Sequence, residues 1–436
     1  MQAGAAWRKL FTKKHLHKRY FEKIAHSPSV GLDKITTKKF EESLDENIEI
    51  ILRKVSDNSY VFTRYRQMLF LKGPNKNPRQ ICIPTVRDKL TLSVLNELVY
   101  EVFGTSCRTE MPQSIINRIS KNLDKYDSFV KIDVSSFYAS IEHKTLFRKI
   151  RKRIRKPEIL CLIQNAIETE ALACPVKEKV KRGKREQGIP EGLPISNSLA
   201  NIYLADIDDE FKADGRFIYF RYVDDILILI NEHDIDEVEA KITDNLSKLG
   251  LKINDKSTRG KIDQGFEYLG YFMSPRGVTV RKSSVLKLEQ SLEELINKMK
   301  NEPSEYTEWK LNLKISGFIY NQNKYGWIFF YSQISDVSLL FRLDALVEKL
   351  MQRNGLVQEI KRKRYVRTYH EVTQALHMTR YVPNFDKYDI EDKRRVVNKV
   401  YKKDVSNFSA IQVEDLFRKI ISKEIRDIEK DIQAFS

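Results

Sequence analysis

The chain has 436 residues, 41% of them hydrophobic, and its 77 Lys and Arg outnumber 60 Asp and Glu to give a formal charge of +17. This length and composition exclude a disordered chain and leave room for about two to four domains. The positive excess indicates a polyanionic partner, of which nucleic acid is the simplest.

The cysteines and the apolar runs exclude several further classes. No C-x-x-C pair is present, so neither a zinc knuckle nor a disulfide framework is expected. No apolar run approaches the ~20 residues that span a bilayer. The basic start of the chain lacks the apolar stretch of a secretory signal. We therefore expect a cytoplasmic protein without a membrane partner.

In chain order, strand patterns with period two alternate with longer helical patterns. The strand patterns are residues 129–134, 216–222 and 226–230, and the helical ones are 142–170, 195–213 and 234–249, the last ending at Gly250. The two later strands flank Asp224 and Asp225, which predicts a hairpin with this acidic pair at its turn. The order strand, helix, strand, strand, helix is typical of a split βαβ sheet backed by helices, an α+β fold.

Beyond about residue 283 strand patterns mostly vanish, and apolar residues recur at helical spacing. These stripes predict core-facing sides of helices in a helical region. They are Leu286, Leu292, Leu295, Ile296 and Met299, and then Leu416, Phe417, Ile420, Ile421, Ile425, Ile428 and Ile432. Basic runs stand at residues 361–364 and 394–395 of this region, and at 148–156 and 177–185 earlier in the chain. Either of the earlier runs is a phosphate-binding surface or a solvated face.

The acidic centre is the sequence Tyr222-Val223-Asp224-Asp225 between two apolar strands. Adjacent carboxylates repel each other, and a cation that prefers oxygen ligands, such as Mg²⁺, relieves the repulsion. Asp133 ends another strand of the same predicted sheet and supplies a third carboxylate. Alone, an Asp-Asp pair is most often a surface turn. The surrounding pattern favours a site for two metal ions.

Seven segments in order carry a resemblance to reverse transcriptases, with the Tyr222–Asp225 box as the central one. They are residues 31–36 (GLDKIT), 79–85 (RQICIPT), 133–141 (DVSSFYASI), 188–196 (GIPEGLPIS), 222–225 (YVDD), 251–257 (LKINDKS) and 268–271 (YLGY).

This resemblance implies a right-hand polymerase fold with an added helical region. The division it implies is N-terminal helices and fingers over 1–125, a palm over 126–282 with fingers insertions around 150–190, a thumb over 283–350, and a basic helical region over 351–436.

The resemblance also implies a role for individual residues. The catalytic carboxylates would be Asp133, Asp224 and Asp225, and these residues with Val134 would hold two Mg²⁺ ions. The implied nucleotide-binding residues are Lys72, Arg79, Tyr138, Glu191, Gly192 and Lys256.

Among the nucleotide-binding residues, Lys72 and Arg79 would bind the triphosphate, although a solvated basic turn is the alternative for both. Tyr138 would exclude ribonucleotides, with Phe137 in the core. Glu191 departs from the family's usual Gln, and a carboxylate there cannot donate a hydrogen bond. Lys256 would protonate the leaving pyrophosphate, or simply be solvated.

Within the family, the chain is most similar to the bacterial defence-associated reverse transcriptases, in size to the type 2 system, and less so to retron and group II intron enzymes. The implied activity is RNA-directed DNA synthesis from deoxynucleotides, giving a DNA product. The implied partner is a dedicated noncoding RNA template, and the implied role is antiphage defence. The alternatives are a maturase or RNA-binding scaffold and an RNA-dependent RNA polymerase.

Overall fold

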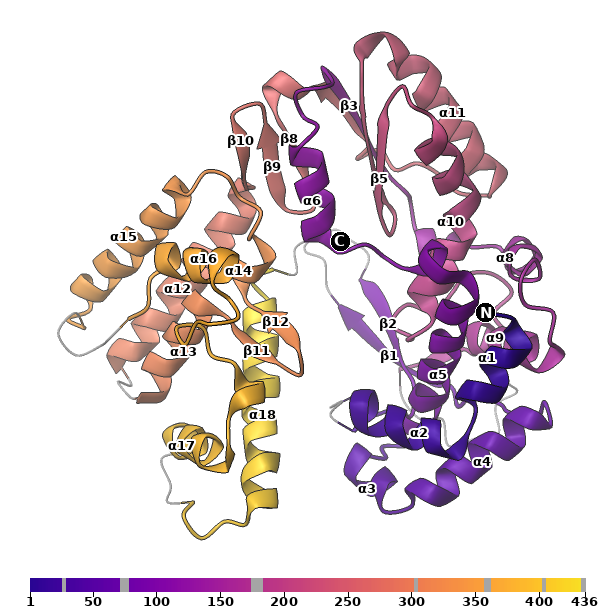
Figure 1. The fold of residues 1–436 in the computed structure, drawn as a ribbon, viewed down its shortest axis with the longest axis horizontal. Helices are drawn as coiled ribbons and strands as arrows, with labels where there is room; N and C mark the ends of the chain where they lie inside the picture. The colour runs from indigo at the N-terminus through magenta and orange to yellow at the C-terminus, as the bar shows by residue number, and fades with distance from the viewer. Residues whose placement is uncertain are drawn as a thin grey trace. The chain divides into compact units, whose positions relative to one another are not determined.

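The acidic hairpin is part of a four-stranded sheet in the computed structural model (Figure 1). The sheet has the spatial order β5-β6-β3-β7, in which β6 is antiparallel to both β5 and β3. Along the chain, helices lie between β3 and β5, β6 follows β5 directly, and α11 precedes β7. This connectivity and order are those of a split βαβ sheet, so the α+β expectation is confirmed.

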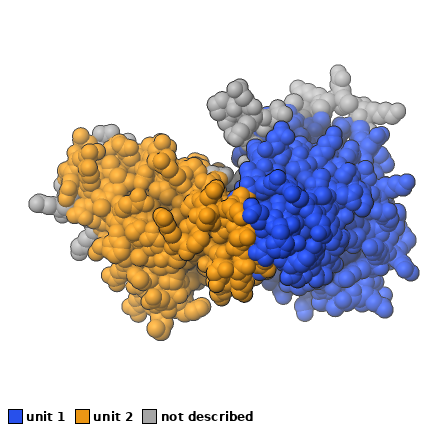
Figure 2. All heavy atoms as spheres, turned by 90° about the horizontal axis from the view of Figure 1, so that it is seen from above, with its two compact units in different colours: residues 1–110, 128–259 blue, residues 111–127, 260–436 orange. Residues whose placement is uncertain are grey.

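The structure describes residues 1–25, 29–70, 78–173, 183–301, 305–356, 362–401 and 405–432. The chain divides into unit 1, residues 1–110 and 128–259, and unit 2, residues 111–127 and 260–436 (Figure 2). The finer division into fingers, palm, thumb and C-terminal region stays a prediction.

Unit 1 combines the acidic sheet with a small second sheet, in the order β2-β1-β4, and a set of helices. Its strands are β1 Tyr65–Phe70, β2 Arg79–Ile83, β3 Ser128–Asp133, β4 Ala171–Leu172, β5 Ile218–Tyr222, β6 Asp225–Ile230 and β7 Thr258–Lys261, the last reaching the unit boundary. Its helices are α1 Ala3–Leu10, α2 Lys13–Arg19, α3 Thr37–Glu41, α4 Leu44–Ser56, α5 Val86–Phe103, α7 Phe137–Ser140, α8 His143–Ile150, α9 Pro157–Glu168, α10 Ser196–Ala213 and α11 Ile235–Lys248.

Strand β6 fixes the position of the acidic pair. Residues 226–230 read Ile-Leu-Ile-Leu-Ile, and each of the five side chains is fully buried. A strand that is apolar on both faces is covered on both sides, so β6 cannot shift without exposing these side chains. Burial of each contributes roughly 1.5–3 kcal/mol. The acidic turn is therefore attached to one of the most strongly held strands of the unit.

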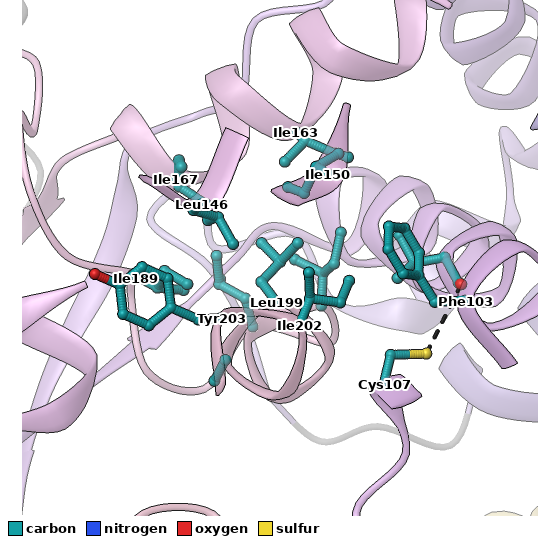
Figure 3. Packing of buried hydrophobic residues seen from close by; sticks show 14 of the residues in the cluster. Phe103, Cys107, Leu146, Ile150, Ile163, Ile167, Ile189, Leu199, Ile202 and Tyr203 are labelled. Carbon is teal, nitrogen blue, oxygen red and sulfur yellow. Dashed lines mark hydrogen bonds between the residues drawn. The ribbon is translucent and has the colours of Figure 1, made fainter. Parts of the chain in front are cut away.

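Helix α10 packs its apolar side against α8 and α9 (Figure 3). The helix begins and ends within one residue of the sequence expectation, as does α11, whose end is a left-handed Gly250 with φ 71°. The packed side chains are Leu146, Ile150, Ile163, Ile167, Leu199, Ile202 and Tyr203. In the segment that leads into α10, Ile189 N donates to Tyr138 O at 2.8 Å. This bond connects the segment to the short helix α7.

The expected helical stretch over 142–170 is divided into two separate helices, α8 and α9. The break precedes Pro157, and a residue before proline is disfavoured in helical conformation; Lys156 has ψ 122°. In the basic run 148–156 at this break, Lys149 is the one buried basic residue, and most of the others are exposed. Lys149 Nζ donates to Tyr203 O at 2.6 Å, and Arg153 Nη1 to Val102 O at 3.3 Å. A phosphate-binding surface and a solvated face both stay predictions for the exposed part of the run.

Unit 2 is mostly helical, with a three-stranded sheet β10-β9-β8 and a β11-β12 hairpin that the sequence did not predict. Its strands are β8 Phe266–Tyr268, β9 Tyr271–Ser274, β10 Gly277–Val280, β11 Phe318–Tyr320 and β12 Asn323–Tyr325. Its helices are α6 Pro112–Ser120, α12 Lys282–Asn301, α13 Glu305–Ser316, α14 Trp327–Phe330, α15 Ser338–Arg353, α16 Tyr365–Gln374, α17 Ile390–Tyr401 and α18 Ala410–Glu429.

The apolar stripes of unit 2 are mostly buried, with one exception. In α12, Leu292, Ile296 and Met299 are fully buried, but Leu286 is 47% exposed and its expected core position is wrong. Leu286 lies in the first turns of α12, where helical spacing alone does not show whether a neighbour covers the residue. In α18 the stripe packs into the core of this unit around Phe417. No helix in the described ranges is long and apolar enough to cross a membrane.

Candidate active site

Asp133 and Asp225 face each other across two neighbouring strands. Asp133 is the last residue of β3, Asp225 is the first of β6, and the two are partners in the antiparallel ladder. Tyr222 pairs with Asp225, which leaves Val223 and Asp224 as a two-residue turn. Three carboxylates thus gather at one end of the sheet, as the sequence predicts.

The turn that carries Asp224 has an unusual backbone. Val223 has φ 58°, a left-handed conformation that β-branched residues rarely adopt. Arg221 Nη1 donates to Val223 O at 2.7 Å, and Arg221 Nε donates to Asp208 Oδ1 of α10 at 2.7 Å. Local strain of this kind persists where the surroundings over-determine it, and it is concentrated at functional sites. The Arg221–Asp208 pair is such a support, and sequence reasoning missed it although Arg221 directly precedes the acidic box.

Burial makes the ionised forms of Asp224 and Asp225 unfavourable. It raises the pKa of Asp225 from 3.8 to about 7, with the nearby Asp224 as the next cause. Burial, and after it the charge of Asp133, also raises the pKa of Asp224. A divalent cation would reverse this effect by pairing with the carboxylates.

In the described part of the chain, no three His, Cys, Asp or Glu side chains are grouped closely enough to hold a metal ion as they stand. The donors nevertheless fit Mg²⁺ in kind, because the three carboxylates offer hard oxygen ligands whose mutual repulsion a cation relieves. Val134, the fourth expected ligand, is buried and forms an isolated bridge with Ile253. The assignment of two ions to these residues stays a prediction.

Tyr138 lies beside the acidic end of the sheet but not on a strand. Ser136, with φ 46°, turns the chain from β3 into α7, so Phe137 and Tyr138 lie on a helical turn, and both are buried. The expectation that only Phe137 is a core residue is therefore wrong. Burial raises the pKa of Tyr138, and the charge of Asp224 is the next cause. The Tyr138 hydroxyl donates to Asn197 Oδ1 of α10 at 2.5 Å. Asn197 was missed, although it directly follows the 188–196 segment.

Arg79 and Glu191 form an ion pair, with Arg79 Nε 2.6 Å from Glu191 Oε2. The backbone supports this contact, because Cys82 N donates to Glu191 O at 2.7 Å. The next residue, Gly192, has φ 94°, and a Cβ there would lie 2.7 Å from Cγ2 of Ile81. Only glycine fits this approach to β2. The carboxylate that replaces the family's usual Gln thus holds the arginine expected to bind triphosphate.

Gly188 has φ 83°, and its N–H donates to Ile141 O at 2.8 Å. The turn from Gly188 to Gly192 therefore links α7, which carries Tyr138, to β2, which carries Arg79. The structure brings these predicted site residues together on one side of unit 1.

Two lysines complete the expected site. Lys256 is exposed and close enough to Asp225 for its charge to oppose the rise in the pKa of that carboxyl. The next residue, Ser257, contacts the end of β3, since Asp133 N donates to Ser257 Oγ at 3.1 Å. Ser257 was not predicted as a site residue. Lys72 and most of the basic run 177–185 lie outside the described residues.

Comparison with known proteins agrees with this geometry. Residues 71–273 match the family model described as reverse transcriptase (RNA-dependent DNA polymerase). The chain is 28% identical over 172 residues to the group II intron-encoded protein LtrA of Lactococcus lactis, covering 38% of this chain and 28% of that protein. It is 27% identical over 171 residues to an uncharacterized 91 kDa protein in a cob intron of Schizosaccharomyces pombe, covering 37% and 20%.

Among solved structures, telomerase from Candida albicans with the TWJ fragment of telomeric RNA matches 92% of this chain and 68% of that chain, at 12% identity and a TM-score of 0.44. This chain spans less than a third of the length of its curated relatives. The matched residues 71–273 include Asp133, Asp224 and Asp225. This match supports the expected right-hand polymerase fold. Residues 71–273 of the chain are thus similar in sequence to reverse transcriptases.

Proposed function

We propose that this protein is an RNA-directed DNA polymerase, a nucleotidyltransferase that adds deoxynucleotides to a primer on an RNA template. The observation that carries the proposal is the meeting of Asp133 and Asp225 across β3 and β6, beside Asp224, within a segment of the reverse transcriptase family. Neither a surface turn nor a scaffold needs three partly buried carboxylates at one sheet end.

Asp133, Asp224 and Asp225, with Val134, would hold two Mg²⁺ ions. Such ions activate the attacking 3′-hydroxyl and stabilise the leaving pyrophosphate. In the proposed reaction Arg79 neutralises charge on the triphosphate once the phosphates displace Glu191 from its guanidinium. Lys256, exposed beside the carboxylates, is placed to donate a proton to pyrophosphate.

Tyr138 would select the sugar. Its hydroxyl is fixed by Asn197, so the ring has one orientation, and a fixed ring excludes a 2′-oxygen more strongly than a mobile one. Selection of deoxynucleotides distinguishes the proposed enzyme from an RNA-dependent RNA polymerase.

We further propose that the template is a dedicated noncoding RNA and that the enzyme acts in the bacterial cytoplasm in antiphage defence, as in the type 2 system. This part rests on the resemblance of the ordered segments and on the +17 charge. A group II intron-like maturase is the second candidate, favoured by the 28% identity to the Lactococcus intron-encoded protein.

The test is extension of a DNA primer annealed to an RNA template, with Mg²⁺ and either deoxynucleotides or ribonucleotides. The proposal predicts template-dependent incorporation of deoxynucleotides. Preferred incorporation of ribonucleotides, or none of either, would contradict it. Sequencing the RNA that co-purifies separates the two candidates: one abundant structured species supports the dedicated template, and intron RNA supports the maturase.

A further inference from the structure

Unit 2 contains a surface cavity of about 440 Å³ beside α16, which belongs to no part of the acidic site. The cavity is lined by side chains of α16 and of the segment that follows it. They are Arg367, Glu371, Thr379, Arg380 and Tyr381. Two arginines and an aromatic ring thus face one open space.

The first arginine is held by the ring. The guanidinium carbon of Arg367 lies 4.3 Å from the centroid of Tyr381, a stacked cation–π distance. Its ion pair with Glu371 is long, at 3.5 Å between Nε and Oε1. The ring itself is anchored, because the Tyr381 hydroxyl accepts from Arg364 N at 2.7 Å. Arg367 therefore presents a flat guanidinium face in a fixed place.

The second arginine, Arg380, has no polar partner among the described residues. Arg380 is exposed and forms no hydrogen bond or ion pair with a described residue. Lys363 Nζ lies 5.4 Å from the centroid of the same ring, but Lys363 is not part of the lining and its Nζ donates to Ser316 Oγ. Like charges gathered around one cavity repel, and an anion placed among them relieves the repulsion.

Glu371 restricts the kind of anion. A carboxylate in the lining repels a ligand that is only phosphate, but it accepts hydrogen bonds from base N–H groups or from a ribose 2′-hydroxyl. The cavity therefore offers guanidinium groups for phosphate, a planar stack for a base, and an acceptor for a neutral donor. An acidic peptide would use only the first of these.

We propose that the cavity formed by Arg367, Arg380 and Tyr381 binds one nucleotide of a single-stranded segment of RNA. The base stacks on the Arg367–Tyr381 pair, and Arg380 contacts the phosphate. The inference rests on the proposed function for its RNA partner, and it adds a contact outside the family segment 71–273.

The test compares RNA binding by the full-length chain carrying Arg367→Ala with Arg380→Ala against a control carrying Arg395→Ala with Arg426→Ala. The control removes the same charge from exposed positions of α17 and α18 in the same unit. With a single-stranded RNA, we expect the cavity variant to bind about tenfold or more weakly and the control to bind nearly as the wild type does. The salt dependence of log K should also become shallower by about 0.7 for each phosphate that the cavity variant no longer binds.

Tyr381→Ser and Tyr381→Phe separate the ring from its hydroxyl. The serine variant should weaken binding and the phenylalanine variant should retain it, while melting temperatures report whether the unit stays folded. Equal RNA affinity of the cavity variant and the control would overturn the inference. The proposed function has its own readout, because extension of a short preannealed primer–template by the wild type does not depend on this cavity. Absence of that extension would count against the polymerase, whatever the cavity binds.

Discussion

Replacing Asp225 by Asn should stabilise the metal-free protein at neutral pH while destroying its activity. Burial raises the pKa of Asp225 from 3.8 to about 7, so the folded state binds a proton more tightly than the unfolded chain does. The stability contribution is therefore fully present below about pH 4 and is lost as pH rises through about 7. Asn does not titrate, so the variant escapes this loss.

The size of the effect follows from the same values. A pKa that moves from 3.8 to about 7 corresponds to about 4 kcal/mol, at about 1.4 kcal/mol for each tenfold change in proton affinity. Partial exposure of the carboxyl to solvent reduces this to about 2 kcal/mol. Urea unfolding with a chelator, at several pH values from about 4 to about 8, measures the difference between Asp225→Asn and wild type.

The expected difference is near zero at about pH 4 and grows to about 2 kcal/mol in favour of the variant above about pH 7. Mg²⁺ should then stabilise the wild type more than the variant, since only the wild type gains a ligand by ionising. A difference that does not change with pH, or a variant that is less stable at about pH 8, would refute the reasoning.

Substitutions at three positions test the residues around the three carboxylates. Glu191→Gln should lower KM for deoxynucleotides severalfold with little change in kcat, because Arg79 no longer has to leave a carboxylate; steady-state kinetics would show an unchanged or higher KM if the ion pair has no such effect. Tyr138→Ala should admit ribonucleotides at least about tenfold better, with lower stability because the ring is buried; Tyr138→Phe keeps the ring but loses the bond to Asn197, so it should lose less selectivity than Tyr138→Ala, and single-nucleotide incorporation measures both. Gly192→Ala should unfold or inactivate the protein, since its Cβ would meet Ile81 at 2.7 Å and φ is 94°; a normal melt and normal activity would contradict this.

Sequence patterns predicted the hairpin, β3, α10 and α11 because each is specified locally. A run such as Ile226–Ile230 has one way to be buried, and Gly250 ends α11 by its own conformation. The patterns failed where contacts with residues distant in sequence determine whether a side chain is buried. Leu286 has helical spacing, but no residue in the described ranges covers it fully, and Tyr138 is buried because the chain turns into α7 after Ser136.

In the candidate site, too, the sequence predicted the locally specified residues and missed those that depend on distant contacts. Asp133 and Asp225 are ends of strands and Asp224 lies in the turn between β5 and β6, so all three could be located from strand patterns alone. The groups that hold the site come from elsewhere in the chain, as Asp208 does for the acidic turn and Asn197 for Tyr138. Short polar side chains of this kind have no distinctive spacing, so only the fold reveals their partners. The burial of Lys149 was not predicted for the same reason, because its acceptor, Tyr203 O, is distant in sequence.

The most direct test of the central claim is single-nucleotide incorporation on an RNA template by the wild type and by Asp133→Asn, run beside thermal melts and RNA binding. Asp133 ends β3 opposite Asp225, and Asn keeps the shape of the side chain while removing its charge. The account predicts RNA-templated addition of deoxynucleotides by the wild type, none detectable by the variant, and nearly equal RNA affinity for both. Appreciable incorporation by Asp133→Asn would contradict the assignment of the carboxylates as the catalytic centre.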